Sequence, residues 1–224
     1  MPRIISFSGN LGSGKDTVGQ DAISYLTSKG YKAEKFFFSE ALKRFCVDVL
    51  GLNESHVFGT QEDKNKVTHL KWEDMPGVVI TLDENIKDFS IVKVGLDSIP
   101  TKLIAHRPGY MTVREVLQFV GTEIGRRMYD NIWIDATFRK IQKSDCDFVI
   151  FTDGRFHNEL DYLRKYGTVL VCLMRQPIRV GLEHSSETQL TTYKNWDELL
   201  DNRNLSIEEQ REEVIKIIEK YFNV

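Results

Sequence analysis

The sequence has few cysteines, no excess of basic charge and no long apolar run. Its three cysteines are far apart among 224 residues and do not have the spacing of metal ligands. They lie in apolar stretches, which is typical of reduced thiols in the core of a cytosolic protein. The chain has 30 Lys and Arg against 33 Asp and Glu, a net charge of −3. This near balance argues against binding to a nucleic acid polymer.

No apolar stretch approaches the roughly 18 residues that a membrane helix needs, and the first residues lack the basic and apolar regions of a signal peptide. We therefore expect a cytoplasmic protein that does not contact a membrane. Internal repeats and low-complexity segments are also absent. A hydrophobic content of 41% and 28% charged residues are ordinary for a folded protein. The length is enough for one well-buried core, so we expect a single domain over residues 1–224.

Short apolar segments alternate with amphipathic segments along most of the chain. Strands are expected at residues 3–8, 35–38, 147–152 and 168–173, and helices are expected to begin near residues 15, 39, 112, 158 and 206. Capping boxes are predicted for Thr112 with Glu115 and for Ser206 with Glu209. Wholly apolar strands between helices indicate a mainly parallel sheet covered on both faces. The predicted class is α/β, with three αβα layers.

Two of the expected helices have apolar residues at helical spacing, and each set is expected to face the core. These residues are Leu42, Phe45, Cys46, Val49 and Leu50 in the first helix, and Val113, Val116, Leu117, Val120 and Ile124 in the second.

Residues 52–110 are the least regular part of the sequence. Two β-rich pieces, at 78–82 and 91–94, predict a hairpin. We interpret this region as an insertion between core elements rather than as a separate domain.

A glycine-rich loop lies between the first expected strand and the first helix. Gly9, Gly14 and Lys15 fit the P-loop pattern G-x-x-x-x-G-K-[ST]. Glycines let backbone N–H groups converge on an anion, and the helix N-terminus adds positive potential. Lys15 supplies a charge for the β- and γ-phosphates of ATP. The residues expected to bind the nucleotide are Gly9, Gly12, Ser13, Gly14, Lys15, Asp16 and Thr17.

Asp16 departs from this pattern because it occupies the Ser/Thr position, and Thr17 follows it. A hydroxyl at that position normally ligates Mg²⁺. A carboxylate is also a hard oxygen ligand, and it binds Mg²⁺ directly or through water. Alternatively, Asp16 only stabilises the helix N-terminus by its charge and Thr17 ligates the metal. The sequence leaves both residues as candidate Mg²⁺ ligands.

Five segments resemble the deoxynucleoside monophosphate kinases of tailed bacteriophages. They are SGNLGSGKDT (8–17), SEALK (39–43), TVREVLQFVGTEIGRR with Trp133 (112–133), FVIFTDGRFHNE (148–159) and EHSSE (183–187). The similarity extends from the start of the chain to about residue 190, and residues 52–110 match more weakly. The resemblance implies a P-loop NTPase fold in which residues 52–110 are an inserted region that binds the nucleoside monophosphate. It also implies a lid-like segment at about 175–195.

The resemblance further implies direct in-line transfer of the γ-phosphoryl group of ATP, with Mg²⁺, to a deoxynucleoside 5′-monophosphate. The implied catalytic residues are Lys15, Asp16, Arg175 and Arg179. The residues implied in binding the acceptor are Lys43, Arg114, Glu123, Arg126, Arg127, Trp133, Asp153, Arg155 and Glu159.

Several of these residues also have a structural interpretation. Lys43 fits a solvated helix face, and Arg114 could simply pair with a carboxylate. A large aromatic residue such as Trp133 is as often a core residue as a base-stacking one. Asp153, at the end of a strand, could cap the next turn.

Gly121 and Gly125 lie inside an expected helix, where each costs about 1 kcal/mol relative to alanine. That cost indicates either the close approach of a ligand or another backbone, or a break in the helix.

Two other functions stay open at this point. One is a P-loop kinase for another small phosphorylated acceptor, of the phosphomevalonate or dephospho-coenzyme A type. The other is an ATP-binding switch that is not a kinase. We expect small-molecule nucleotides as substrates, and the sequence leaves open whether the protein is a homodimer.

Overall fold

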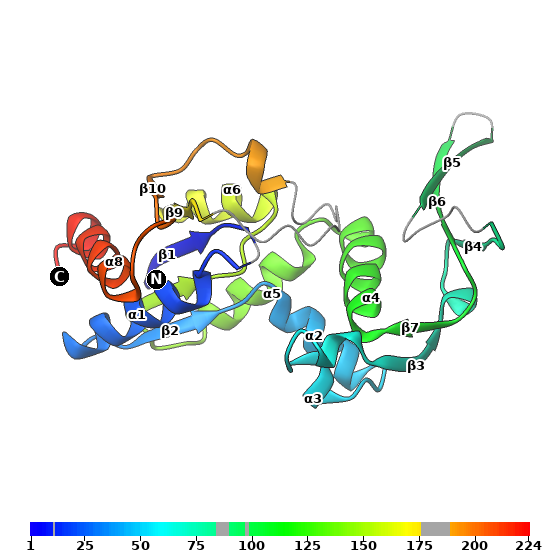
Figure 1. Ribbon diagram of the computed structural model, residues 1–224, viewed down its shortest axis with the longest axis horizontal. Coiled ribbons are helices and arrows are strands. Elements are labelled where there is room, and N and C mark those ends of the chain that lie inside the picture. Colours follow the sequence, from blue (N-terminus) through cyan, green and yellow to red (C-terminus); the bar gives the residue numbers. More distant parts are fainter. Residues whose placement is uncertain (11, 84–89, 97–98, 176–188) are drawn as a thin grey trace. The chain divides into compact units, whose positions relative to one another are not determined.

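The computed structural model describes residues 1–10, 12–83, 90–96, 99–175 and 189–224 (Figure 1). The chain forms two compact units. The first, which we call the core unit, consists of Met1–Ala41 and Tyr129–Val224, and the second, the inserted unit, consists of Leu42–Met128. The inserted unit extends beyond residues 52–110 at both ends, because Cys46 and Val116 belong to the same apolar cluster as Trp72.

The core unit contains a five-stranded sheet in the order β10-β9-β1-β8-β2. All its strand pairs are parallel, and Ile5 of β1 lies opposite Ile150 of β8 and Val169 of β9. The order reverses at β1, and ligands of open α/β sheets bind beyond the carboxyl ends of the strands at such a point. The strands are β1 (Arg3–Ser8), β2 (Ala33–Phe36), β8 (Phe148–Phe151), β9 (Val169–Leu173) and β10 (Glu198–Leu200).

Helices cover both faces of this sheet. They are α1 (Lys15–Ser28), α5 (Ile132–Ile141), α6 (His157–Lys165) and α8 (Ile207–Phe222). Ile5 and Phe7 of β1 pack with α1 and α8, whereas Ile4 packs with α5 and α6. This alternation is that of a strand buried on both faces, so the predicted three-layer αβα architecture is confirmed. None of the described helices is long and apolar enough to cross a membrane.

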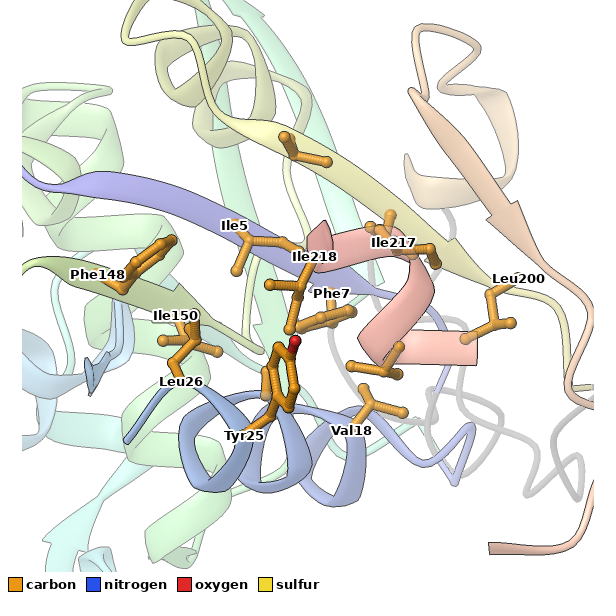
Figure 2. Packing of buried hydrophobic residues seen from close by; sticks show 14 of the residues in the cluster. Ile5, Phe7, Val18, Tyr25, Leu26, Phe148, Ile150, Leu200, Ile217 and Ile218 are labelled. Carbon is orange, nitrogen blue, oxygen red and sulfur yellow. The ribbon is translucent and has the colours of Figure 1, made fainter. Parts of the chain in front are cut away.

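Packing between α1, α8 and β1 fixes the helix that follows the glycine-rich loop. Figure 2 shows Val18 and Tyr25 of α1 directed toward Phe7 of β1 and Ile218 of α8. The Tyr25 hydroxyl donates a hydrogen bond to Glu219 at 2.6 Å. Complete burial of one such aliphatic side chain stabilises a fold by about 1.5–3 kcal/mol. Helix α1 is therefore held in place against β1 and α8.

The inserted unit combines short helices with two small sheets. Strands β3 and β7 pair antiparallel, and β4, β6 and β5 form a second sheet in that order. The helical elements are α2 (Ser39–Asp48), α3 (Glu54–Val57), α4 (Val113–Gln118), the π-helix η3 (Phe119–Arg126) and the short 3-10 helices η1 (Asp63–Asn65) and η2 (Trp72–Asp74). The strands are β3 (Val67–Lys71), β4 (Val78–Ile80), β5 (Ser90–Leu96), β6 (Ile99–His106) and β7 (Tyr110–Thr112).

The hairpin predicted between residues 78–82 and 91–94 is wrong. Strand β5 instead pairs antiparallel with β6, and β4 pairs parallel with β6. The sequence pattern did not indicate β6 because Pro100 lies near its start, and proline in a strand pattern argues against a strand.

The second strand of the core also differs from the prediction. It covers Ala33–Phe36 rather than residues 35–38. The N–H groups of Phe38 and Ser39 donate to the carboxylate of Asp153. The chain therefore leaves the sheet two residues earlier than the apolar pattern predicts. Helix α5 and strand β10 were not predicted.

Two predicted apolar faces are narrower than expected. Phe45 of α2 and Val49, which follows the helix, are 39% and 65% exposed, whereas Cys46 is buried. Leu42, Cys46 and Val47 of α2 pack with the apolar cluster of the inserted unit, and Val49 lies beyond the end of the helix at Asp48. Ile124 is 36% exposed, because η3 is a π-helix and its wider turn displaces the α-helical face.

Both predicted capping boxes are confirmed, and the one on α8 gives a pH test. Glu209 Oε2 accepts from the Ser206 N–H at 2.8 Å. This backbone bond lowers the pKa of Glu209 below 4.5. A lowered carboxyl pKa stabilises the fold above pH 4.5, and this contribution is lost as pH falls through the native pKa.

The variant Glu209→Gln keeps the capping box but removes its charge. By circular dichroism, wild type should melt higher than this variant near pH 7, and the difference should disappear at low pH. A difference that grows on acidification would contradict this.

Candidate active site

The glycine-rich loop joins β1 to α1 at the carboxyl edge of the core sheet. Gly9, Gly12 and Gly14 have φ values of 155°, 77° and 93°. Gly14 is the N-cap of α1 in the left-handed conformation. A Cβ on Gly9 would lie 2.7 Å from Ser13 Oγ and 3.0 Å from the carbonyl oxygen of Leu173. Glycine is thus required at these turns, and such a turn at a helix N-terminus directs backbone N–H groups at an anion.

Lys15 and Ser13 give the loop its polar groups. The Lys15 side chain folds back over the loop, with Nζ donating to the carbonyl oxygen of Asn10 at 2.7 Å, and only 8% of the residue is exposed. Ser13 is fully buried, and its hydroxyl has no hydrogen-bond partner among the described residues. A buried polar group without a partner costs about 1–3 kcal/mol. The Lys15 ammonium group on this glycine-rich loop fits a nucleotide polyphosphate as ligand, whereas the Ser13 hydroxyl is enclosed by the protein.

The Asp16 carboxylate is oriented by one residue of β2 and by one that directly follows β8. Its Oδ1 accepts from the Thr152 hydroxyl at 2.9 Å and lies 3.6 Å from Lys35 Nζ. The Asp16 side chain is 81% exposed, and Thr17 is exposed as well. Among the described residues no three His, Cys, Asp or Glu side chains form a metal cluster. Asp16 and Thr17 therefore fit a Mg²⁺ site that phosphate oxygens and water complete, as is usual for nucleotide-bound Mg²⁺.

Gly19 makes room for the contact between Thr152 and Asp16. A Cβ on Gly19 would lie 2.5 Å from Thr152 Cγ2, so α1 approaches β8 closely at this position. Alanine normally favours a helix by about 1 kcal/mol. Gly19→Ala should nevertheless lower the unfolding free energy by about 1–3 kcal/mol, since the added methyl overpacks the site. Thermal unfolding measures this change.

The matched control is Gln20→Ala, an exposed neighbour in the same helix, which should not be destabilised. Adding Thr152→Ser to Gly19→Ala removes the clashing methyl and keeps the hydroxyl, and should restore most of the loss. No recovery in the double variant would show that the clash is not the cause.

Asp153 follows β8 and joins this strand to the turn before α2. Its two carboxylate oxygens accept from Phe38 N at 3.1 Å and from Ser39 N at 3.0 Å. Burial raises the pKa of the Asp153 carboxyl, although the two backbone N–H groups and the nearby Arg155 act in the opposite direction. In this arrangement Asp153 caps the distant turn at Phe38 and Ser39, rather than the turn that follows it in the chain.

Glu159 and Trp133 are also placed inside the core unit. Glu159 is 3% exposed, and its Oε2 accepts from the backbone N–H groups of Arg155 and Phe156 at 2.8 and 3.1 Å. It thereby caps the start of α6. Trp133 lies on α5 and is 8% exposed. The carboxylate of Glu159 and the ring of Trp133 are therefore largely withdrawn from solvent.

Arg175 follows β9 and lies against the loop between β10 and α8. Its Nε donates to the carbonyl oxygen of Asn202 at 3.2 Å, and its backbone N–H donates to Asn202 Oδ1 at 2.9 Å. Of the lid-like segment expected at about 175–195, residues 176–188 with Arg179 lie outside the described residues.

The remaining predicted site residues belong to the inserted unit. Arg114 donates to Gln61 Oε1 at 2.6 Å and to Asn65 Oδ1 at 3.3 Å, so these partners are amides rather than the carboxylate considered as an alternative. Lys43 Nζ lies 5.3 Å from the ring centre of Phe58. The other three residues lie near the end of η3: Glu123 and Arg126 within it and Arg127 at its C-cap, with Arg127 NH1 at 4.0 Å from Glu123 Oε2.

The surroundings of Gly121 in η3 account for one of the two glycines that lie inside the expected helix. A Cβ there would lie 2.8 Å from Leu42 Cδ2. The neighbour is a side chain rather than another backbone, and the helix does not break at Gly121 but continues as the π-helix η3.

Comparison with known proteins identifies the family. A sequence profile described as deoxynucleotide monophosphate kinase matches residues 3–214. The chain belongs to this family. A putative deoxynucleotide monophosphate kinase of Acanthamoeba polyphaga mimivirus is 28% identical over 228 residues, covering 96% of each chain. A deoxynucleoside-5′-monophosphate kinase of Escherichia phage T5 is 26% identical over 213 residues, covering 84% of this chain and 85% of that one. The resemblance seen in the sequence motifs is confirmed, and the chain is a kinase.

The chain also matches solved structures, at low TM-scores. An APS kinase of Mycobacterium tuberculosis has a TM-score of 0.40 and 17% identity, and the match covers 97% of this chain and 99% of that one.

Sequence reasoning missed two buried amides beside the loop of this kinase, Asn202 and Gln210, which are 0% and 2% exposed. The helical spacing held a signal for Gln210. It precedes Val214 by four residues and Ile217 by seven, so it lies on the apolar face of α8. A polar residue in such a position requires a partner, and here the partner is Asn202.

Proposed function

We propose that this kinase transfers the γ-phosphoryl group of ATP to the phosphate of a deoxynucleoside 5′-monophosphate, and so forms the diphosphate. The observation that carries the proposal is the loop between β1 and α1, where Gly14 is left-handed and Lys15 Nζ is held 2.7 Å from the Asn10 carbonyl. The family match over residues 3–214 supports a deoxynucleotide as the acceptor.

The residues of the loop have distinct tasks in this proposal. Backbone N–H groups near Gly14 bind the β-phosphate, and Lys15 neutralises charge on the β- and γ-phosphates as the bond to the leaving group lengthens. Asp16 or Thr17 holds Mg²⁺, which supplies further charge neutralisation when it is bound. The acceptor phosphate is already a nucleophile near pH 7, so in-line transfer requires no strong base.

The acceptor phosphate requires cationic side chains, and we assign this task to arginines of the inserted unit. Arg126 and Arg127 lie in the last turn of η3 and just after it, and a guanidinium group binds a phosphate through two parallel hydrogen bonds. Arg114 and Lys43 are further candidates from this unit. Arg175 and Arg179 stay proposals for closure over the transferred group.

A coupled assay of ADP release tests the proposed function. The acceptors are dAMP, dGMP, dCMP and dTMP, their ribonucleotide forms, phosphomevalonate and dephospho-coenzyme A, together with a reaction without acceptor. We expect ADP release that requires both Mg²⁺ and at least one deoxynucleoside monophosphate. Release that proceeds equally without an acceptor would instead indicate an ATP-binding switch. Release with only phosphomevalonate or dephospho-coenzyme A would move the chain to another acceptor class.

A further inference from the structure

A group of buried polar side chains lies directly behind the phosphate-binding loop. Asn202 is fully buried, and its Nδ2 donates to the carbonyl oxygen of Ser13 at 2.9 Å and to Gln210 Oε1 at 2.6 Å. Its Oδ1 accepts from the backbone N–H of Arg175 at 2.9 Å. Both polar atoms of the amide are therefore bonded, and a buried network with satisfied groups specifies one arrangement.

The Ser13 carbonyl determines where the next peptide N–H points. The chain has no cis peptide bond among its described residues, and the carbonyl and the N–H of a trans peptide point in opposite directions. Asn202 holds the Ser13 oxygen toward the protein interior. The N–H of Gly14 is consequently directed away from the interior, to the open side of the loop. That N–H belongs to the N-cap residue of α1, where anions bind.

The loop packs on the amide pair without an intervening side chain. A Cβ on Gly14 would lie 3.4 Å from Gln210 Oε1 and 3.7 Å from Asn202 Nδ2. A change in either amide is therefore transmitted to the backbone of the loop. Asn202 also fixes the end of β9, since its backbone oxygen accepts from Arg175 Nε at 3.2 Å.

We propose that Asn202 is a positioning residue for the donor nucleotide, which acts by holding the Ser13–Gly14 peptide in the orientation that binds phosphate. Gln210 supports it by holding the second N–H of the Asn202 amide. The proposal deepens the proposed function and rests on it for the identity of the nucleotide. Neither amide contacts the nucleotide; both act through the loop backbone.

The substitution Asn202→Asp tests this directly. It keeps the size of the side chain and the oxygen that accepts from Arg175, but replaces the donor to Ser13 by an oxygen. Gln210 can rotate its amide and donate to the new carboxylate, so the unmatched contact falls on the Ser13 carbonyl. We expect KM for ATP and the dissociation constant for ADP to rise about 10-fold. KM for the deoxynucleoside monophosphate should change less than about twofold, because the acceptor does not bind this peptide.

Asn204→Asp is the matched control, because it introduces the same charge at an exposed position in the same loop. It should leave both constants unchanged. Calorimetric titration with ADP alone separates this proposal from the proposed function. If the wild type releases no ADP with any acceptor, the proposed function fails while the ADP affinity still tests Asn202. An unchanged ADP affinity in Asn202→Asp, or an equal rise in both KM values, overturns the positioning role.

A second variant decides the matter should Asn202→Asp fail to fold. Gln210→Met keeps a similar length and leaves the bond from Asn202 to Ser13 in place, but removes the partner that restrains the amide. The ADP dissociation constant is expected to rise about threefold, with a normal far-ultraviolet circular dichroism spectrum. An ADP affinity equal to that of wild type in this variant overturns the proposal.

Discussion

Lys15→Ala is expected to lower kcat/KM for ATP by about 10³-fold, the effect of removing a charged group that binds the transition state of phosphoryl transfer. The ammonium group of Lys15 is held at the loop by the Asn10 carbonyl, and the residue is 8% exposed. Its position is therefore set before the nucleotide binds. Steady-state ADP release with a saturating deoxynucleoside monophosphate measures the loss.

Lys29→Ala is the matched control for this experiment. Lys29 is an exposed lysine at the other end of α1, and its removal should leave kcat/KM within about twofold of wild type. Both variants should have the circular dichroism spectrum of the wild type. A folded Lys15→Ala enzyme that keeps most of its activity would contradict the assignment of the loop.

Asp153→Ala is expected to lower the unfolding free energy by about 2–4 kcal/mol, because it leaves two backbone N–H groups without their acceptor in a partly buried turn. These groups belong to Phe38 and Ser39, at 3.1 and 3.0 Å from the carboxylate. Removing the carboxylate also removes the contact that joins the end of β8 to the start of α2. Urea unfolding followed by tryptophan fluorescence measures the change.

Asp147→Ala provides the comparison. Asp147 Oδ2 also accepts a backbone N–H, from Lys32 at 2.9 Å, but this contact is exposed to solvent. Water replaces the carboxylate there, so the loss should stay below about 1 kcal/mol. Equal losses at Asp147 and Asp153 would show that burial of the Asp153 turn is not what makes its carboxylate important.

The phosphate-binding loop was predictable because its signal is local. Gly9, Gly14 and Lys15 are fixed by backbone conformation and by one charge, and both requirements are visible in seven consecutive residues. The same holds for the capping boxes at Thr112 and Ser206, whose partners are three residues away.

The role of Asp153 was harder to predict because its partners are 114 and 115 residues away in the chain. The interpretation as a cap or as a substrate ligand depends on the neighbouring strand, and sequence periodicity does not identify that neighbour. The register of β8 against β2 brings Asp153 to the turn at Phe38 and Ser39. The buried pair Asn202 and Gln210 has the same origin, since the contact with Ser13 spans 189 residues.

The inserted unit was predicted least well because its apolar pattern is interrupted. Pro100 lies near the start of β6, and a π-helix replaces an α-helix from Phe119. The α-helical spacing therefore placed Ile124 in the core, whereas the residue is 36% exposed. Both features depend on local backbone geometry that binary patterning does not encode.

The central claim is that backbone N–H groups from Gly12 to Lys15 bind the phosphates of the donor nucleotide. A crystal structure of the protein with ADP and Mg²⁺ tests it most directly. We predict the β-phosphate within hydrogen-bond distance of the Gly14 and Lys15 backbone nitrogens, with the Ser13 carbonyl still bonded to Asn202. A nucleotide whose phosphates lie away from this loop, or a loop whose N–H groups face elsewhere, would contradict the claim.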